Sequence, residues 1–143
     1  MKRIFSVFLT AIIVFSFASC GKKINFESDI KKLESIGFNS VKTAESEDEL
    51  SELTETFNFK IASDHGKFEV KITGYQTFNK TSEDDYFSCQ FIEFESETQA
   101  KNYFDFYISS RLESSDYKLK IYENKIILTN SEEAMKALQG KFE

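Results

Sequence analysis

Two helix-start signals, fifty residues apart, constrain the fold more strongly than any other feature of this 143-residue sequence. Residues 46–49 (Ser-Glu-Asp-Glu) and 96–99 (Ser-Glu-Thr-Gln) both match the capping box, in which a serine oxygen accepts a hydrogen bond from a free backbone N–H and the Glu or Gln side chain reaches back. Apolar residues then recur at helical spacing, at Leu50, Leu53 and Phe57 after the first signal and at Ala100, Tyr103, Phe104, Tyr107 and Ile108 after the second. The sequence therefore predicts one helix that begins at Ser46 and another over residues 98–112.

Strand-like segments flank both predicted helices. Residues 67–73 and 117–122 alternate between apolar and polar side chains, which is the period of a half-buried strand. Further strands are predicted over residues 38–43, 57–62, 86–95 and 125–129, the last one joined to its predecessor by a two-residue hairpin loop at Glu123-Asn124. The polar stretch 74–85 is predicted to be the longest exposed loop, either a functional loop or a simple linker.

Two more helices complete the predicted architecture, one over residues 28–36 that ends at Gly37 and one over residues 131–138 that ends at Gly140. Six short strands and four helices, with hairpins dominating, predict an α+β fold: a mainly antiparallel sheet with helices packed on one face. Both halves can be written strand, helix, strand, strand. This order indicates either an internal pseudo-repeat or a coincidence of element order.

The N-terminus carries a different kind of signal. Lys2 and Arg3 precede an apolar run over residues 4–18, and Phe17-Ala18-Ser19-Cys20 closes that run. This arrangement resembles the signal peptide and lipobox of bacterial lipoproteins, with Phe17 in the place of the usual Leu. The resemblance implies cleavage between Ser19 and Cys20, diacylation of the Cys20 thiol, and Cys20 as the mature N-terminus. An ordinary secretory signal and a retained transmembrane anchor are the alternatives, although a spanning helix needs about twenty apolar residues.

The lipobox divides the chain into three parts. Residues 1–19 are the predicted signal peptide, residues 20–25 are the lipidated cysteine with a short tether, and residues 26–143 are one α+β domain of ordinary size. Five tether residues reach at most roughly 17 Å, so the domain is expected close to the bilayer on the extracytoplasmic side of a cell membrane. Whether that membrane is an inner membrane, an outer membrane or the membrane of a single-membrane cell stays open.

Cleavage leaves 16 basic and 24 acidic side chains, a formal charge of −8. Such a charge repels nucleic acid phosphates, so no nucleic acid partner is expected. Membrane contact is expected through the acyl chains on Cys20. Lys22 and Lys23 are an exception, since they either add attraction to an anionic leaflet or only keep the tether soluble.

Cys89 is the one cysteine besides Cys20, so no disulfide framework is expected and stability must come from an apolar core. Alternation places Cys89 on the same strand face as Phe87 and Phe91, which favours a buried small hydrophobe over a reactive thiol. Most of the aromatic side chains also fall on predicted core faces. Core packing is therefore favoured over a binding platform as their role.

Motifs for catalysis, cofactors and metals are missing from the sequence. The single histidine, His65, lies beside Asp64 and is predicted to be a solvated turn residue, with Gly66 supplying a positive φ. One His and one distant Cys do not make a zinc site, and the acidic stretches 45–52 and 83–85 lack the ordering of a calcium loop. No catalytic, cofactor-binding or metal-binding residue is therefore predicted, and the chain is not expected to be an enzyme.

Three functions remain. The leading hypothesis is a non-enzymatic binding or accessory module of the bacterial envelope, anchored by Cys20, that engages an envelope protein or a small ligand through one sheet face or the acidic stretch 83–85. The first alternative is an inhibitor-like or structural domain whose sheet blocks a partner enzyme. The second is a carboxylate hydrolase, which predicts a deep pocket with two acids about 5 to 9 Å apart. The sequence leaves the oligomeric state open.

Overall fold

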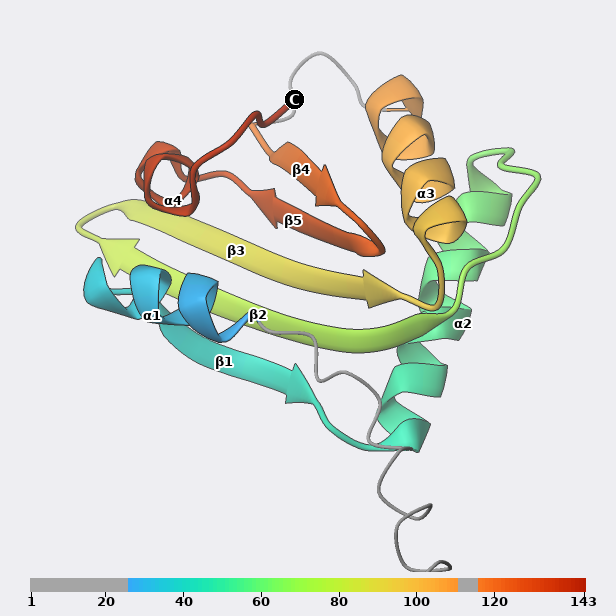
Figure 1. Ribbon diagram of the computed structural model, residues 1–143, viewed down its shortest axis with the longest axis horizontal. Coiled ribbons are helices and arrows are strands. Elements are labelled where there is room, and N and C mark those ends of the chain that lie inside the picture. Colours follow the sequence, from blue (N-terminus) through green and yellow to red (C-terminus); the bar gives the residue numbers. More distant parts are fainter. Residues whose placement is uncertain (1–25, 111–115) are drawn as a thin grey trace, which may run out of the picture.

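The computed structural model describes residues 26–110 and 116–143, which form a five-stranded antiparallel sheet and four helices (Figure 1). The predicted lipidation site at Cys20, the predicted cleavage site between Ser19 and Cys20, and the predicted tether all lie outside the described residues. In chain order the elements are α1 (Glu27–Ser35), β1 (Asn39–Ala44), α2 (Glu47–Ser63), β2 (Ile72–Ser82), β3 (Asp85–Phe94), α3 (Glu97–Ser110), β4 (Lys118–Tyr122), β5 (Lys125–Thr129) and α4 (Glu132–Leu138). The predicted α+β class and the antiparallel sheet are confirmed.

The strands lie in the order β1-β2-β3-β5-β4, and each neighbouring pair is antiparallel. The long β2–β3 hairpin runs through the middle of the sheet, with register from Ile72 opposite Phe94 to Ser82 opposite Asp85. Beside β3, all five residues of β5 are buried. The C-terminal residue covers the outer edge of β4, because Leu119 and Glu143 exchange two backbone hydrogen bonds of 2.9 and 2.8 Å.

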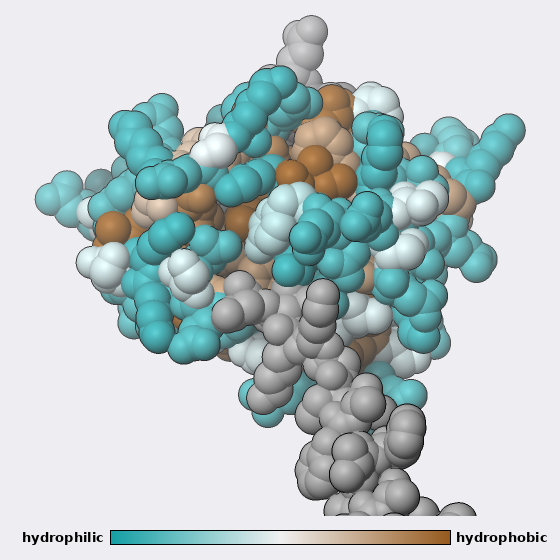
Figure 2. All heavy atoms as spheres, in the orientation of Figure 1, coloured by the Kyte–Doolittle hydropathy of each residue, from teal (hydrophilic) through white to brown (hydrophobic). Residues whose placement is uncertain are grey.

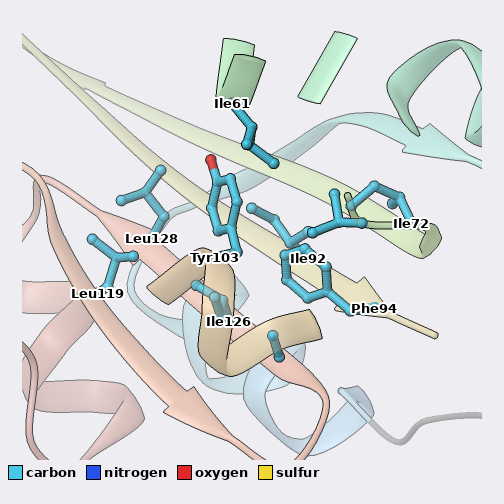
Figure 3. Packing of buried hydrophobic residues seen from close by; sticks show 10 residues of the cluster. Ile61, Ile72, Ile92, Phe94, Tyr103, Leu119, Ile126 and Leu128 are labelled. Atoms are coloured by element: carbon cyan, nitrogen blue, oxygen red, sulfur yellow. The ribbon is translucent and has the colours of Figure 1, made fainter. Parts of the chain in front are cut away.

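Helices pack on both faces of the sheet, which corrects the prediction of helices on one face. One core cluster joins Ile61 of α2 and Tyr103 of α3 to strand residues such as Ile92 (Figure 3). The other joins Leu33 of α1 and α4 to the neighbouring strand residue Phe91. We call these sides the α2/α3 face and the α1/α4 face. Consecutive apolar residues in β3 and β5 require both faces to be covered, because neighbouring strand residues point to opposite sides.

Helix α2 is longer than predicted and includes residues 57–62, for which the sequence predicted a strand. The alternation of Phe57, Phe59 and Ile61 suggested a strand. On the helix, Phe57 and Ile61 are four residues apart and both turn toward the core, whereas Phe59 is left 76% exposed. The strand, helix, strand, strand order is therefore wrong for the first half of the chain, because that order needs this segment as a strand.

The segment after α2 is extended but joins the sheet only at Ile72, although the sequence predicted a strand over residues 67–73. Side chains take the place of a neighbouring strand. Val70 exchanges hydrogen bonds of 2.8 and 2.9 Å with the side-chain amide of Asn58. The next two N–H groups, of Lys71 and Ile72, donate to Gln99 Oε1 at 2.8 Å and Thr54 Oγ1 at 2.9 Å. Helices α2 and α3 are thereby fastened to this segment.

Residues 74–85 form most of the β2–β3 hairpin, so the predicted long exposed loop is wrong. Only Glu83 and Asp84 remain as its turn, and Glu83 has a φ of 49°. The stretch contains few apolar side chains and no strict alternation, so its strand character comes from pairing with β1 and β3 and not from local pattern. The acidic stretch 83–85 is consequently a hairpin end, not a loop.

Helix termini follow the sequence signals closely. Gly37, with a φ of 91°, ends α1 in a Schellman motif, in which Phe38 N–H donates to Leu33 O and Gly37 N–H donates to Glu34 O. Ser46 and Glu49 form the complete capping box of α2. At α3 only the serine half is present, because Gln99 accepts the hydrogen bond from Lys71 N–H.

Gly66, in the turn after α2, has a different role from the predicted one. His65 is exposed and itself adopts the positive φ, 65°. Gly66 is needed for close approach, since a Cβ at this position would lie 2.4 Å from Ile61 Cγ2.

Two lysines complete the α1/α4 face. Lys80 on β2 donates to Ile36 O at the end of α1, at 2.6 Å, and to Glu133 at 2.6 Å. Lys120 on β4 donates to Leu138 O and Gln139 O at the end of α4. A cation at a helix C-terminus satisfies free carbonyl groups and interacts favourably with the helix dipole. Each of the two helices is thus held at its C-terminus by a strand lysine.

The Asn58 contact gives a stability prediction. Asn58→Leu should lower the free energy of unfolding by about 1–3 kcal/mol, because the N–H and carbonyl of Val70 lose their partners. Urea denaturation checks this, with Asn102→Leu on the exposed side of α3 as the matched control. Equal midpoints for the two variants would contradict the role given to Asn58.

Candidate ligand-binding pocket

A pocket of about 240 Å³ opens on the α2/α3 face, where the two helices meet the sheet. Its lining comes from α2, α3, two strands and the approach to β4: Thr56, Phe57, Lys60, Gln90, Tyr103, Tyr107, Tyr117 and Leu128. Half of these side chains are aromatic and three of them are tyrosines. An apolar cavity with a few polar groups is the usual form of a small-molecule site.

Helical and strand periodicity bring the lining together. Tyr103 and Tyr107 are four residues apart on α3 and so share one side of that helix. Gln90 shares a face of β3 with Ile92 and Phe94, and its strand partner on β5 is Leu128. Gln90 and Ser88, the preceding residue of this face, are thus polar, whereas the following residues Ile92 and Phe94 are apolar.

The aromatic rings contact one another around Tyr103. Its ring centroid lies 5.2 Å from that of Phe57, 5.4 Å from that of Phe94 and 6.3 Å from that of Tyr107. Figure 3 shows Tyr103 standing between Leu128 and Ile92, with its hydroxyl oxygen on the side of Ile61. These contacts fix the ring and leave the hydroxyl at the pocket.

Three polar side chains of the lining have no partner among the residues that the structure describes. Tyr103 is only 5% exposed, yet its hydroxyl makes no hydrogen bond to any other residue that the structure describes. The half-buried Gln90 amide and the Lys60 ammonium likewise have no hydrogen bond or ion pair within residues 26–110 and 116–143. None of the three is enclosed from solvent: Lys60 is exposed, and the one enclosed side-chain polar atom without a partner among the described residues is Asn79 Oδ1. Water can therefore satisfy these groups in the free protein, and a ligand that displaces this water must replace its hydrogen bonds. Burial also raises the pKa of the Tyr103 hydroxyl, which therefore stays neutral and able to donate.

Three further hollows lie elsewhere. One of about 570 Å³ lies between α4 and the C-terminal residues, one of about 340 Å³ between α2 and the start of β2, and one of about 330 Å³ between α3 and the β4–β5 turn. None of these three is lined by more than two aromatic side chains. The aromatic pocket is therefore the strongest candidate site.

On the α1/α4 face, the buried side chain of Lys125 is less accessible to ligands than the aromatic pocket. Lys125 is 8% exposed, and its ammonium lies over the rings of Phe26 and Tyr122 at 5.4 and 5.1 Å. Its strand partner Glu93 has a raised pKa, mainly because of burial, against which the hydrogen bond from Asn124 acts. The cation is held by aromatic faces, so we assign this group to packing of the N-terminal residues.

The other residues that the sequence offered as site candidates lie apart from the pocket. Cys89 is fully buried beside Phe91, as predicted, and burial raises the pKa of its thiol to about 12. His65 and Asp64 are exposed at the end of α2, and the acids of the stretch 83–85 lie at the tip of the β2–β3 hairpin. Within the described ranges, no group of three or more His, Cys, Asp or Glu side chains could hold a metal ion.

The pocket residues were missed because the sequence favoured the core for nearly all aromatic side chains. Tyr103 does pack in the core, and its ring alone gives no sign of a site. The available signal was Gln90, a polar residue next to the apolar Ile92 and Phe94 on the same strand face. This signal can be interpreted only when the helices that cover this strand face are known.

Comparisons of the chain with protein-family models, with curated proteins and with solved structures found no match. Among the residues described, no helix combines the length and apolar character needed to cross a membrane.

The buried thiol gives a prediction about pH. Unfolding brings the Cys89 pKa from about 12 back toward its ordinary value, so the unfolded chain loses this proton first as pH rises. Stability is fully present below the ordinary pKa and is lost as pH rises toward 12, by about 2 kcal/mol at pH 10.5. Urea midpoints at pH 8 and pH 10.5 measure the loss. Cys89→Ala should reduce it, and an unchanged pH dependence would contradict this assignment.

Proposed function

We propose that this protein is a lipid-anchored, extracytoplasmic binding module of the bacterial envelope that takes a small ligand in the pocket between α2 and α3. The observation that carries the proposal is the aromatic pocket in which the Tyr103 hydroxyl and the Gln90 amide have no partner among the described residues. Polar groups that line a cavity without a protein partner are available to hydrogen-bond a bound molecule.

The anchor and the pocket are on opposite faces under this proposal. Phe26, the first described residue, packs on the α1/α4 face, with its ring centroid 4.7 Å from Phe91 and 6.3 Å from Tyr122. Residues 21–25 would span at most roughly 17 Å between this point and the acylated Cys20. The α1/α4 face would therefore lie toward the bilayer and the pocket would open away from it.

The surface on the anchor side supports attachment through acyl chains. Figure 2 shows the side on which α1 lies in front of the strands, and hydrophilic side chains dominate it, with hydrophobic residues visible only as small patches. Such a surface gives little apolar area for insertion into lipid. Membrane binding would thus depend on Cys20.

Binding has more support than the two alternative functions. Among the described residues, no carboxylate lines the aromatic pocket, whereas the hydrolase alternative needs two. Helices pack on both faces of the sheet, so an inhibitor that acts through an open sheet face has less support than a pocket.

The anchor is tested by metabolic labelling with a palmitate analogue. Cys20→Ala should abolish the label and move the protein out of the membrane fraction, because it removes the only acylated thiol of the lipobox. Cys89→Ala is the matched control and should keep the full label, since Cys89 is buried. Equal labelling of wild type and Cys20→Ala would remove the anchor from the proposal.

A further inference from the structure

We propose that the ligand of the aromatic pocket is a single sugar ring, neutral or with at most one negative charge. This inference rests on the proposed binding function and names its ligand class. It follows from the size of the pocket, the charges around it and the polar groups that line it.

Size limits the part of a ligand that the pocket can enclose. At about 240 Å³ the pocket is smaller than the roughly 300–1,000 Å³ that is usual for drug-sized molecules, so it accommodates one ring and not an extended chain. A longer saccharide would place one residue in the pocket and the rest outside it.

Charge narrows the ligand class further. Among the described residues, Lys60 is the one charged residue of the lining, and its ammonium has no ion pair within this set. This ammonium repels cations, so the four aromatic rings are not suited to act as a cage for a quaternary ammonium group. A nucleotide or other polyanion needs several cations, and the mature chain carries a net charge of −8. A neutral ring, or a ring with one carboxylate, fits these charges.

Polar groups in the pocket match a ring that bears hydroxyl groups. The Tyr103 hydroxyl can donate and accept, and the Gln90 amide offers two donors and one acceptor. The neighbouring faces of Phe57 and Tyr107 are apolar, as are the C–H faces of a pyranose ring. A flat aromatic ligand would fill the apolar space but would leave the amide and the hydroxyl unsatisfied.

The test uses the mature lipoprotein in nanodiscs of phosphatidylethanolamine and phosphatidylglycerol, without sugar-based detergents. Saturation-transfer NMR titrations measure binding of glucose, N-acetylglucosamine, glucuronate, choline, adenosine monophosphate and phenylalanine amide. We expect saturable binding of at least one of the three sugars and none of the other compounds.

Two variants assign the binding to the pocket. Tyr103→Phe removes one oxygen atom that has no partner among the described residues, so it should weaken sugar binding about tenfold while the melting temperature stays close to that of the wild type. Gln90→Leu should weaken binding at least as much. Tyr86→Phe, at a tyrosine that is 57% exposed near the hairpin end, is the matched control and should leave the affinity unchanged. Loss of affinity without loss of stability is a result that a purely structural Tyr103 would not give.

Two results would overturn the inference in distinguishable ways. Tyr103-dependent binding of choline, the nucleotide or the aromatic amide, with no sugar bound, would show that the ligand class is wrong while the pocket function stands. Absence of binding across the panel, or sugar binding that both pocket variants leave unchanged, would overturn the ligand class and the pocket function together. The label on Cys20 reports on the anchor independently of either result.

Discussion

Three side chains supply the hydrogen bonds that residues 70–72 would otherwise take from a neighbouring strand. Asn58 and Thr54 come from α2 and Gln99 comes from α3. Both helices are therefore fastened to the same short segment, which continues directly into β2. Their spacing on the sheet follows from this attachment, and the pocket exists because the two helices are held at that spacing over β3 and β5.

The sheet must bury both of its faces, and no disulfide is available within the described residues to relieve that demand. Apolar residues at consecutive positions in β5 leave no solvent-facing side, so helices are needed above and below it. The short helices α1 and α4 have little intrinsic stability. Strand lysines Lys80 and Lys120 compensate by binding the carbonyls at their C-termini.

Local signals predicted those elements whose formation depends on local chemistry. Gly37 ended α1 and Ser46 began α2, because capping satisfies groups within a few residues of the cap. Prediction failed where distant contacts decided the structure. Residues 57–62 alternate like a strand yet continue a helix, and residues 74–82 read as a loop yet pair on both sides. A short stretch of sequence predicts neither the helix over residues 57–62 nor the strand over residues 74–82. The hydrogen bonds of β2, for example, come from pairing with β1 and β3.

The candidate site was beyond prediction for a related reason. A tyrosine on a helix face contributes the same apolar area whether its hydroxyl meets a protein partner, water or a ligand, so the sequence pattern of Tyr103 indicates only core. The distinguishing property is a missing partner, and a missing partner appears only after every neighbour has been placed. The Tyr103 oxygen is not enclosed by the described residues, so water can be its hydrogen-bond partner in the free protein. A ligand that enters the pocket displaces this water and must replace its hydrogen bond, so under the proposed function the hydroxyl matters to binding and the ring to packing.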